Sequence, residues 1–291
     1  MNPPRERAFA RDGWRLVAAE AGLAEEASRA LIEKSLAAAR GALGAPRRRS
    51  RHARTWQLRI GAPATLEVFI KLLDPPNAIG RLKRIARGGR AEHVARVTRA
   101  LAASGFAAPP ILLRGAERAS GRELIVAPRA EGDGPLRTLA ALGANPAGLA
   151  RKRAVMRALG AEIARLHRCG FVHGDLTPFN IFFVPAELPR FVLIDHERTR
   201  RACAIGRRRR MLRNFVQLGR FELPGVTATD RMRVLSGYTA GMTRARRRAT
   251  MRRAAAMVRR RLRRDGSARI APLGADGDGR GRARGDGIGD G

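Results

Sequence analysis

Alternating apolar and polar positions mark two neighbouring strands in the first third of the chain. Thr55 to Ile60 alternates with the two-residue period of a strand, and the apolar run Leu66 to Leu73 follows it. The segment Gly61-Ala62-Pro63-Ala64 between them has the composition of a turn. The pattern therefore predicts a β-hairpin whose second strand carries Lys71 near its end.

Helical spacing follows the hairpin. Apolar residues three or four apart predict a helix over Arg90 to Leu101, and Gly105 with Pro109-Pro110 ends it. A further strand is expected at Glu123 to Ala127, and a short helix at Leu136 to Leu142. The first half of the chain thus has the pattern of a strand-rich region with a helix between its strands.

The second half is mostly helical. Apolar residues spaced by four, four and three predict a buried helix that Gly170 closes: Val155, Leu159, Ile163 and Leu166. The runs Ile181 to Val184 and Phe191 to Ile194 predict a second hairpin. Helices are then expected around Leu212 and after Thr227, which opens a capping sequence.

This order of elements predicts an α+β, bilobal fold with a small β-rich N-lobe and a mostly helical C-lobe. A length of 291 residues suffices for two modest lobes with separate cores. We expect a largely helical N-terminal extension at 1–39, the N-lobe at 40–127 and the C-lobe at 128–265. The Gly-, Asp- and Arg-rich tail at 266–291 has the composition of a disordered segment.

A large positive charge narrows the set of partners. The formal net charge is +34, which predicts attraction to a polyanion such as an anionic membrane surface, a phosphorylated glycan or nucleic acid. Eleven arginines and no acidic residue lie between Arg244 and Arg264. Aromatic residues make up only 4% of the chain, and this shortage argues against base stacking and thus against a nucleic-acid partner. No feature indicates a protein partner.

The sequence favours a cytoplasmic location. Cys169 and Cys203 show no metal-type or disulfide spacing. The N-terminus lacks the apolar run of a signal peptide. The longest uncharged stretch, Ala100 to Leu113, contains Pro109-Pro110 and does not form a spanning helix. We expect a cytoplasmic protein, peripheral at the inner face of the inner membrane.

The segment from His173 to Asn180 carries the strongest chemical signal. It reads His-Gly-Asp-Leu-Thr-Pro-Phe-Asn, and Asp195 follows at the end of the second hairpin. These residues resemble the catalytic loop and the metal-binding strand of protein-kinase-like enzymes. In that arrangement Asp175 orients the acceptor hydroxyl as the catalytic base, while Asn180 and Asp195 bind Mg²⁺ against the nucleotide phosphates.

Lys71 and Glu92 complete the expected ATP site. Lysine accounts for only four of the 59 basic residues, so a lysine at this strand position is a specific choice. Its compact charge suits a bridge between nucleotide phosphates and a helix carboxylate. Glu92 is the only acidic residue between Asp74 and Glu117, and we therefore expect it to pair with Lys71.

Several departures separate the chain from protein kinases. Gly174 stands where those enzymes have an arginine, Thr177 where Ser/Thr kinases have a lysine, and Asp195-His196-Glu197-Arg198 where Asp-Phe-Gly is usual. No Ala-Pro-Glu signature follows, which leaves little room for a peptide-docking segment. These differences favour a small-molecule or glycan acceptor.

The span from about Lys34 to Tyr238 resembles the lipopolysaccharide kinase (Kdo/heptose kinase) family. The resemblance is carried by four stretches: Phe69-Ile-Lys71 with the later Ala91-Glu92 helix, Gly105-Phe with Pro109-Pro110, Leu166 to Asp175, and Ile194 to Arg198. It implies ATP and Mg²⁺ as cofactors. It also implies a sugar or glycolipid acceptor, namely Kdo or heptose of the lipopolysaccharide inner core.

One expected motif is absent, and two other functions stay open. No G-x-G-x-x-G precedes Thr55, where only Gly41-Ala-Leu-Gly44 and the cationic stretch Arg47 to Arg54 occur, so the phosphate-covering loop is unconventional. The His-Gly-Asp-Leu-x-Pro-x-Asn pattern is also similar to phosphotransferases of soluble molecules such as aminoglycosides. A kinase-like, weakly catalytic protein that binds nucleic acid through its Arg-rich region is the third reading.

Overall fold

The computed structural model divides into two compact units. It describes residues 5–19, 23–50, 52–61, 65–75, 88–134, 142, 146–184, 189–203, 206–219, 221–222, 225–265 and 268–269. One unit comprises residues 1–132, 171–175 and 180–201, and the other comprises 133–170, 176–179 and 202–291. The lobe boundary expected at residue 127 stays a prediction. Apart from residues 142 and 268–269, the predicted helix over 136–142 and the predicted tail lie outside the described residues.

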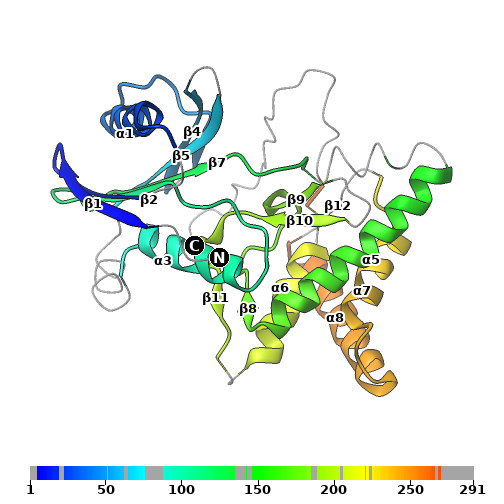
Figure 1. The fold of residues 1–291 in the computed structure, drawn as a ribbon. Helices are drawn as coiled ribbons and strands as arrows, with labels where there is room; N and C mark the ends of the chain where they lie inside the picture. Colours follow the sequence, from blue (N-terminus) through cyan, green and yellow to red (C-terminus); the bar gives the residue numbers. More distant parts are fainter. Residues whose placement is uncertain are drawn as a thin grey trace. The chain divides into compact units, whose positions relative to one another are not determined.

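A seven-stranded antiparallel sheet forms the body of the first unit (Figure 1). Its strand order is β1-β2-β6-β7-β5-β4-β3. The strands are β1 (Glu6–Arg11), β2 (Trp14–Ala19), β3 (Arg48–Ser50), β4 (Ala53–Ile60), β5 (Leu66–Leu73), β6 (Leu113–Glu117) and β7 (Glu123–Pro128). The predicted hairpin is confirmed as β4–β5, and the strand expected at 123–127 is confirmed as β7.

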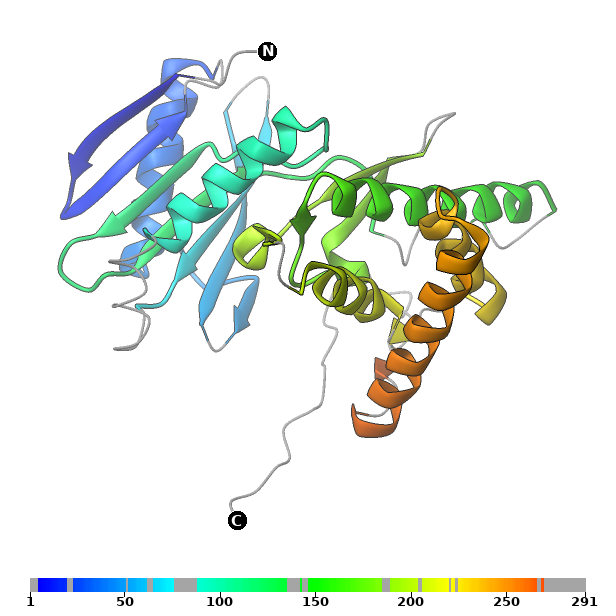
Figure 2. The same cartoon turned by 90° about the horizontal axis from the view of Figure 1, so that it is seen from below.

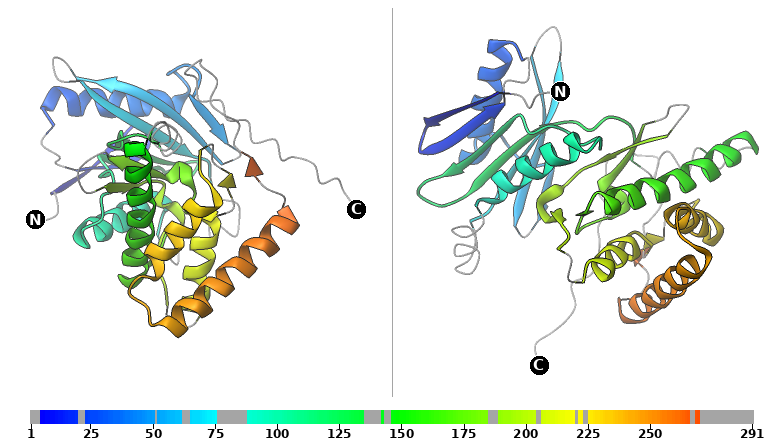
Figure 3. Two further views of the ribbon diagram at one scale, coloured as in Figure 1. Left: turned by 90° about the vertical axis from the view of Figure 1, so that its right-hand side faces the viewer. Right: turned by 60° about the horizontal axis from the view of Figure 1, so that its bottom comes forward.

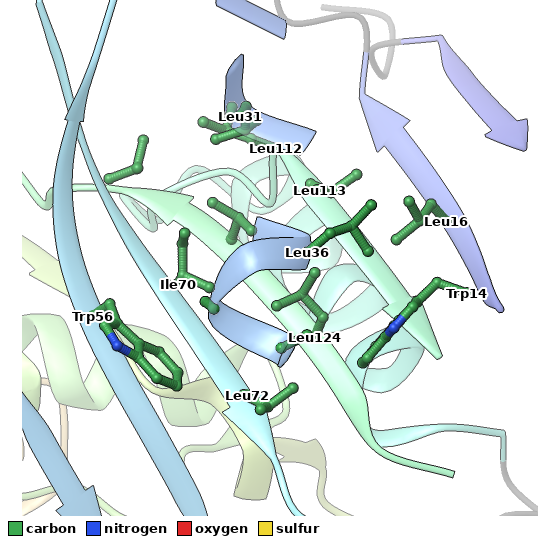
Figure 4. Close-up of a cluster of buried hydrophobic side chains, with 14 of the residues drawn as sticks. Trp14, Leu16, Leu31, Leu36, Trp56, Ile70, Leu72, Leu112, Leu113 and Leu124 are labelled. Carbon is green, nitrogen blue, oxygen red and sulfur yellow. The ribbon is translucent and has the colours of Figure 1, made fainter. Parts of the chain in front are cut away.

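Two helices cover opposite faces of this sheet. On one face, α1 (Glu25–Arg40) packs its leucines against β5 and β7 in the main core (Figure 4). On the other face, α3 (Arg90–Ala103) forms a smaller cluster with Leu73 and Ile125. Since side chains alternate along a strand, Ile70 and Leu72 face α1, whereas Lys71 shares the α3 face with Leu73.

Residues 6–11 and 14–19 belong to the sheet, which corrects the expectation of a mainly helical segment at 1–39. β1 and β2 form a hairpin that pairs with β6, and Trp14 and Leu16 are buried in the main core. Only α1 matches the expected helix. The pairing that defines β2 joins residues about a hundred positions apart in the sequence, and such non-local contacts leave little local signal.

Short elements of the first unit support the segment around Asp175. β8 (Phe171–Val172) pairs with β11 (Arg200–Arg201), and β9 (Ile181–Val184) pairs with β10 (Arg190–Leu193). The β9–β10 pair confirms the second predicted hairpin. The single-turn helix η2 (His196–Arg198) follows this hairpin in the first unit, whereas η1 (Pro178–Asn180), just before β9 in the sequence, has only Asn180 in this unit.

Among its described residues the second unit contains four α-helices: α5 (Pro146–Arg168), α6 (Arg207–Gly219), α7 (Ala228–Thr239) and α8 (Arg244–Asp265). Figures 2 and 3 show α8 beside α6 and α7. A short parallel pair joins β12 (Phe221–Glu222) to β13 (Ala268–Arg269). The helices predicted around residues 155–166, around Leu212 and after Thr227 are confirmed, and Thr227 and Asp230 form the expected capping box at the start of α7.

Glycine allows α5 and α7 to cross closely. A Cβ atom added at Gly160 of α5 would lie 1.9 Å from the carbonyl oxygen of Val234, and one at Gly237 of α7 would lie 2.0 Å from that of Arg157. A side chain at either position would force the helices apart. No helix among the described residues has the length and apolar character needed to cross a membrane.

Candidate functional site

Lys71 lies at the centre of a cluster of charges in the first unit. Its Nζ atom is 3.1 Å from Oδ1 of Asp195, and it also forms an ion pair with Oε1 of Glu197. Burial alone would lower the pKa of Lys71, but the two carboxylates outweigh burial and raise it. Lys71 is therefore protonated at physiological pH.

Glu197 bridges Lys71 and the first residue of helix α3. Its second carboxylate oxygen accepts a hydrogen bond of 2.6 Å from Arg90, the first residue of α3. Only 17% of the Glu197 side chain is exposed. Burial would raise the pKa of Glu197, but Lys71 and Arg90 together lower it. Glu197 is consequently an ionised carboxylate held between two cations.

Glu92 does not contact Lys71, and the expected pairing is corrected. Its carboxylate accepts a 2.6 Å hydrogen bond from Nε of Arg114 on β6 and lies 3.8 Å from Arg99. Strand β7 lies between β6 and β5 in the sheet, so the axes of β6 and β5 are about 10 Å apart. A side chain that contacts β6 is therefore distant from Lys71 on β5. The helix directs Glu92 toward β6, and Glu197 occupies the place expected for it beside Lys71.

The segment from His173 to Asn180 forms a tight loop after β8. Nδ2 of Asn180 donates a hydrogen bond of 2.9 Å to the backbone carbonyl oxygen of Asp175, and it lies 3.4 Å from Oδ2 of the same residue. The amide therefore fixes the backbone at Asp175. The structure brings these two predicted site residues into direct contact.

Ile194 joins this loop to the strand end that carries Asp195. Its carbonyl oxygen lies 2.9 Å from Nε2 of His173, and its N–H donates a hydrogen bond of 3.1 Å to the carbonyl oxygen of Asn180. One residue thus contacts both ends of the loop immediately before Asp195. These two hydrogen bonds fix the position of Asp195 relative to the loop from His173 to Asn180.

Gly174 is required by close packing. A Cβ atom there would lie 2.4 Å from the backbone carbonyl oxygen of Arg198, and its φ angle is +77°. Glycine adopts such an angle without a steric cost, and it leaves room for the backbone of Arg198. The arginine that protein kinases have at this position would not fit, so the loop lacks the cation that receives an activation-loop phosphate.

Asp195 adopts a left-handed backbone conformation. Its φ and ψ angles are 62° and 63°, in a region that costs a residue with a Cβ atom free energy. Aspartate tolerates this region better than most residues, and such outliers cluster at functional sites. The conformation ends β10 and directs the Asp195 carboxylate toward Lys71.

Two buried histidines support the loop through hydrogen bonds. The ring centroids of His173 and His196 are 5.2 Å apart. Burial lowers the pKa of both, that of His196 to about 3. His196 contacts the carbonyl oxygen of Leu193, while Thr199 donates a hydrogen bond to the carbonyl oxygen of His173. Both rings are neutral near pH 7 and form hydrogen bonds within the site.

An arginine-lined groove lies on the second unit, between α6, the end of α7 and α8. Its volume is about 750 Å³. Five arginines line it: Arg207, Arg208, Arg209, Arg246 and Arg253. Its apolar lining consists mainly of Met211, Leu212, Met242, Ala256 and Met257. Within the described part of the chain none of these arginines forms an ion pair, so the groove presents cations beside an apolar surface.

The sequence missed Glu197 as the partner of Lys71. The available signal was the acidic residue in Asp195-His196-Glu197-Arg198, two positions after the predicted metal ligand. The expectation that the partner of Lys71 lies on the helix after it pointed to Glu92 instead of Glu197. Lys71, Asp175, Asn180 and Asp195 all belong to the same compact unit, as their expected roles require.

Comparison with known proteins identifies the family. The profile of the lipopolysaccharide kinase (Kdo/WaaP) family matches residues 83–238, more than half of the chain. No curated protein matches. Among solved structures, WaaP in complex with acyl carrier protein matches with a TM-score of 0.57 and 20% identity, over 86% of this chain and 98% of that one.

Two further solved structures show weaker similarity. The PknI kinase domain of Mycobacterium tuberculosis matches with a TM-score of 0.33 and 17% identity, over 52% of this chain and 56% of that one. The bifunctional kinase-methyltransferase WbdD matches with a TM-score of 0.39 and 16% identity, over 69% of this chain and 47% of that one. The chain belongs to the lipopolysaccharide kinase (Kdo/WaaP) family and is a kinase of protein-kinase-like fold that uses ATP and a sugar or glycolipid acceptor.

Proposed function

We propose that this kinase transfers the γ-phosphate of ATP to a hydroxyl group of Kdo or heptose in the inner core of lipopolysaccharide. The observation that carries the proposal is the Lys71–Asp195 ion pair, held next to the Asp175 loop by the hydrogen bonds of Ile194. Phosphoryl transfer needs a phosphate-binding cation, a metal-binding carboxylate and a base, and these are the groups in that cluster. The family match supports the choice of acceptor.

In the proposed reaction Asp175 orients the acceptor. Its carboxylate accepts a hydrogen bond from the sugar hydroxyl and takes the proton as the hydroxyl oxygen bonds to the γ-phosphorus. The bond between that phosphorus and the bridging oxygen breaks, and ADP leaves. Lys71 binds the nucleotide phosphates, and Glu197 with Arg90 fixes the position of Lys71. The fixed geometry of these groups supplies most of the catalysis.

The donor atoms of Asn180 and Asp195 fit Mg²⁺. Magnesium prefers oxygen ligands and binds through one or two protein groups together with substrate phosphates. Within the described ranges no group of three or more His, Cys, Asp or Glu side chains forms a metal site of its own, which agrees with a site completed by phosphate. Mg²⁺ would neutralise charge on the transferred phosphoryl group, and Asn180 and Asp195 would hold it there.

The arginine-lined groove supports action at an anionic membrane surface, at the inner face of the inner membrane. Arginines near such a surface contribute about 1 kcal/mol each, and the apolar lining of the groove suits lipid chains. The neighbouring His167 adds no charge near pH 7, because burial lowers its pKa to about 4. The attraction therefore comes from arginine and persists at any physiological pH.

A panel of acceptors tests the choice of substrate. ADP release is measured with Kdo-bearing lipid A, with heptosylated lipid A, with an aminoglycoside and with no acceptor. The proposal predicts ADP release that depends on one of the two glycolipids. Turnover of the aminoglycoside alone would contradict it, and would favour a phosphotransferase of soluble molecules instead.

A further inference from the structure

The connection between β3 and β4 lacks the loop with which protein kinases cover ATP. In those enzymes a glycine-rich loop donates backbone N–H groups to the phosphates. Here Ser50 pairs directly with Ala53, so only Arg51 and His52 join the two strands. Neither residue is glycine, so this connection does not have the composition of a glycine-rich loop. Cationic side chains of the neighbouring strands are the alternative groups that can bind phosphate here.

The strand register places one arginine in line with Lys71. Lys71 pairs with Thr55 on β4, and Thr55 pairs with Arg48 on β3. Residues directly opposite each other in antiparallel strands project from the same face of the sheet. Arg48, Thr55 and Lys71 therefore form one row across three neighbouring strands, on the face where Lys71 contacts Asp195.

Neighbouring contacts confirm which face this row occupies. The next row on the same face consists of Ser50, Ala53 and Leu73. Ala53 and Leu73 are buried together against α3, the helix whose first residue binds Glu197. The alternate row, Arg49, Arg54 and Leu72, belongs to the opposite face, where Leu72 enters the core beneath α1.

Arg48 is exposed and available to a ligand. Among the residues that the structure describes, no carboxylate pairs with it. Its Cα atom is two strand spacings, about 10 Å, from that of Lys71, and the side chain between them is the small polar Thr55. Two cations separated in this way can bind successive phosphates of one nucleotide, and a guanidinium group does so with two hydrogen bonds.

We propose that Arg48 binds the polyphosphate of ATP and replaces the glycine-rich loop of protein kinases. The inference rests on the proposed function in one respect only, that ATP occupies the face carrying Lys71 and Asp195. It does not depend on which sugar is phosphorylated. It assigns a role to one member of the cationic stretch Arg47 to Arg54, whose composition alone indicates no specific function.

Arg49 provides a matched control, since it is the adjacent residue on the same strand, carries the same charge and projects from the opposite face. The dissociation constants of Mg-ATP and adenosine are measured by calorimetry at 0.15 M salt for wild type, Arg48→Gln, Arg48→Lys and Arg49→Gln, without acceptor. At this salt concentration charges more than about 8 Å apart are largely screened. The thermal unfolding midpoint of each variant reports its folding.

Arg48→Gln is expected to weaken ATP binding roughly tenfold, the loss typical of a charge-assisted hydrogen bond, and to leave adenosine binding unchanged. Arg48→Lys should restore part of the affinity, and Arg49→Gln should bind ATP like wild type. An equal loss of ATP affinity in Arg48→Gln and Arg49→Gln, or wild-type ATP affinity in Arg48→Gln, would overturn the role of Arg48 but not the proposed function. A wild-type protein that binds no ATP would overturn the proposed function as well.

Discussion

At the residue scale the site depends on which carboxylate holds Lys71. Two acidic residues are available near the start of α3, and the structure distinguishes them. Glu197 forms ion pairs with Lys71 and Arg90, whereas Glu92 forms them with Arg114 and Arg99. Lysine has four rotatable side-chain bonds, so its position beside the phosphates depends on this partner.

Glu197→Gln is therefore expected to lower kcat/KM for ATP roughly tenfold or more. The substitution leaves a half-buried cation without one of its two counter-charges, and it also removes the contact with α3. Glu92→Gln serves as the control and should change kcat/KM by less than about twofold, in line with the small contribution of partly exposed ion pairs. Steady-state ADP release measures both. A larger loss in Glu92→Gln than in Glu197→Gln would restore the pairing expected from the sequence.

The sequence predicts the residues of the loop but not all of their contacts. Asp175, Asn180 and Asp195 could be identified because a fixed spacing within a short segment carries their chemistry. Glu197 could not be identified as the partner of Lys71, because the two residues are 126 positions apart and meet only when β10 ends beside β5. Spacing along the chain predicts local geometry, whereas partner choice depends on strand order.

At the scale of elements, buried polar contacts join the helices of the second unit. His167 of α5 contacts the hydroxyl of Tyr238 on α7 at 2.8 Å and Oδ1 of Asn214 on α6 at 3.1 Å. Burial lowers the pKa of His167 to about 4 and raises that of Tyr238 to about 12. Both groups are neutral at pH 7, and the three helices share one hydrogen-bonded cluster.

This cluster should make folding stability depend on pH below neutrality. The pKa of His167 is lower in the folded than in the unfolded protein, so the unfolded state binds more protons between about pH 4 and 6.5. The contribution of His167 is complete above pH 6.5 and is lost as pH falls, by about 2 kcal/mol at pH 5. Urea unfolding of wild type and His167→Gln at pH 7 and pH 5 measures it. The variant should lose less stability between the two pH values, and an equal loss would contradict the assignment.

Element boundaries show where local pattern suffices and where it does not. α5 and α7 could be predicted because an apolar stripe and a capping box are local signals. β1 and β2 could not, because each has only six residues and is defined by pairing with a strand from another part of the chain. The apolar contribution of Trp14 and Leu16 becomes visible only in the assembled core.

At the scale of the whole molecule, a net charge of +34 does not by itself identify a binding surface. Arginine supplies 55 of the 59 basic residues and occurs throughout the chain. The groove between α6, α7 and α8 combines arginines with an apolar lining, which suits a lipid surface. A specific membrane contact should therefore depend on the position of an arginine and not on the total charge.

Two pairs of substitutions on α8 separate these possibilities. Arg246→Gln with Arg253→Gln removes two charges from the groove, and Arg252→Gln with Arg259→Gln removes two exposed charges outside its lining. Binding to phosphatidylcholine vesicles with and without phosphatidylglycerol is measured by co-sedimentation. The groove pair should weaken binding to anionic vesicles about tenfold and the control pair by no more than about threefold. Equal losses would show that net charge alone attracts the protein.

The central claim is that Asp175 serves a phosphoryl transfer from ATP to an inner-core sugar. Its most direct test is the transfer of labelled phosphate from ATP to Kdo- or heptose-bearing lipid A by wild type and by Asp175→Asn. We expect transfer by wild type and a loss of at least about a hundredfold in kcat for the variant, as when a positioned base is removed, with ATP binding retained. Equal rates of phosphate transfer by the two proteins would contradict it.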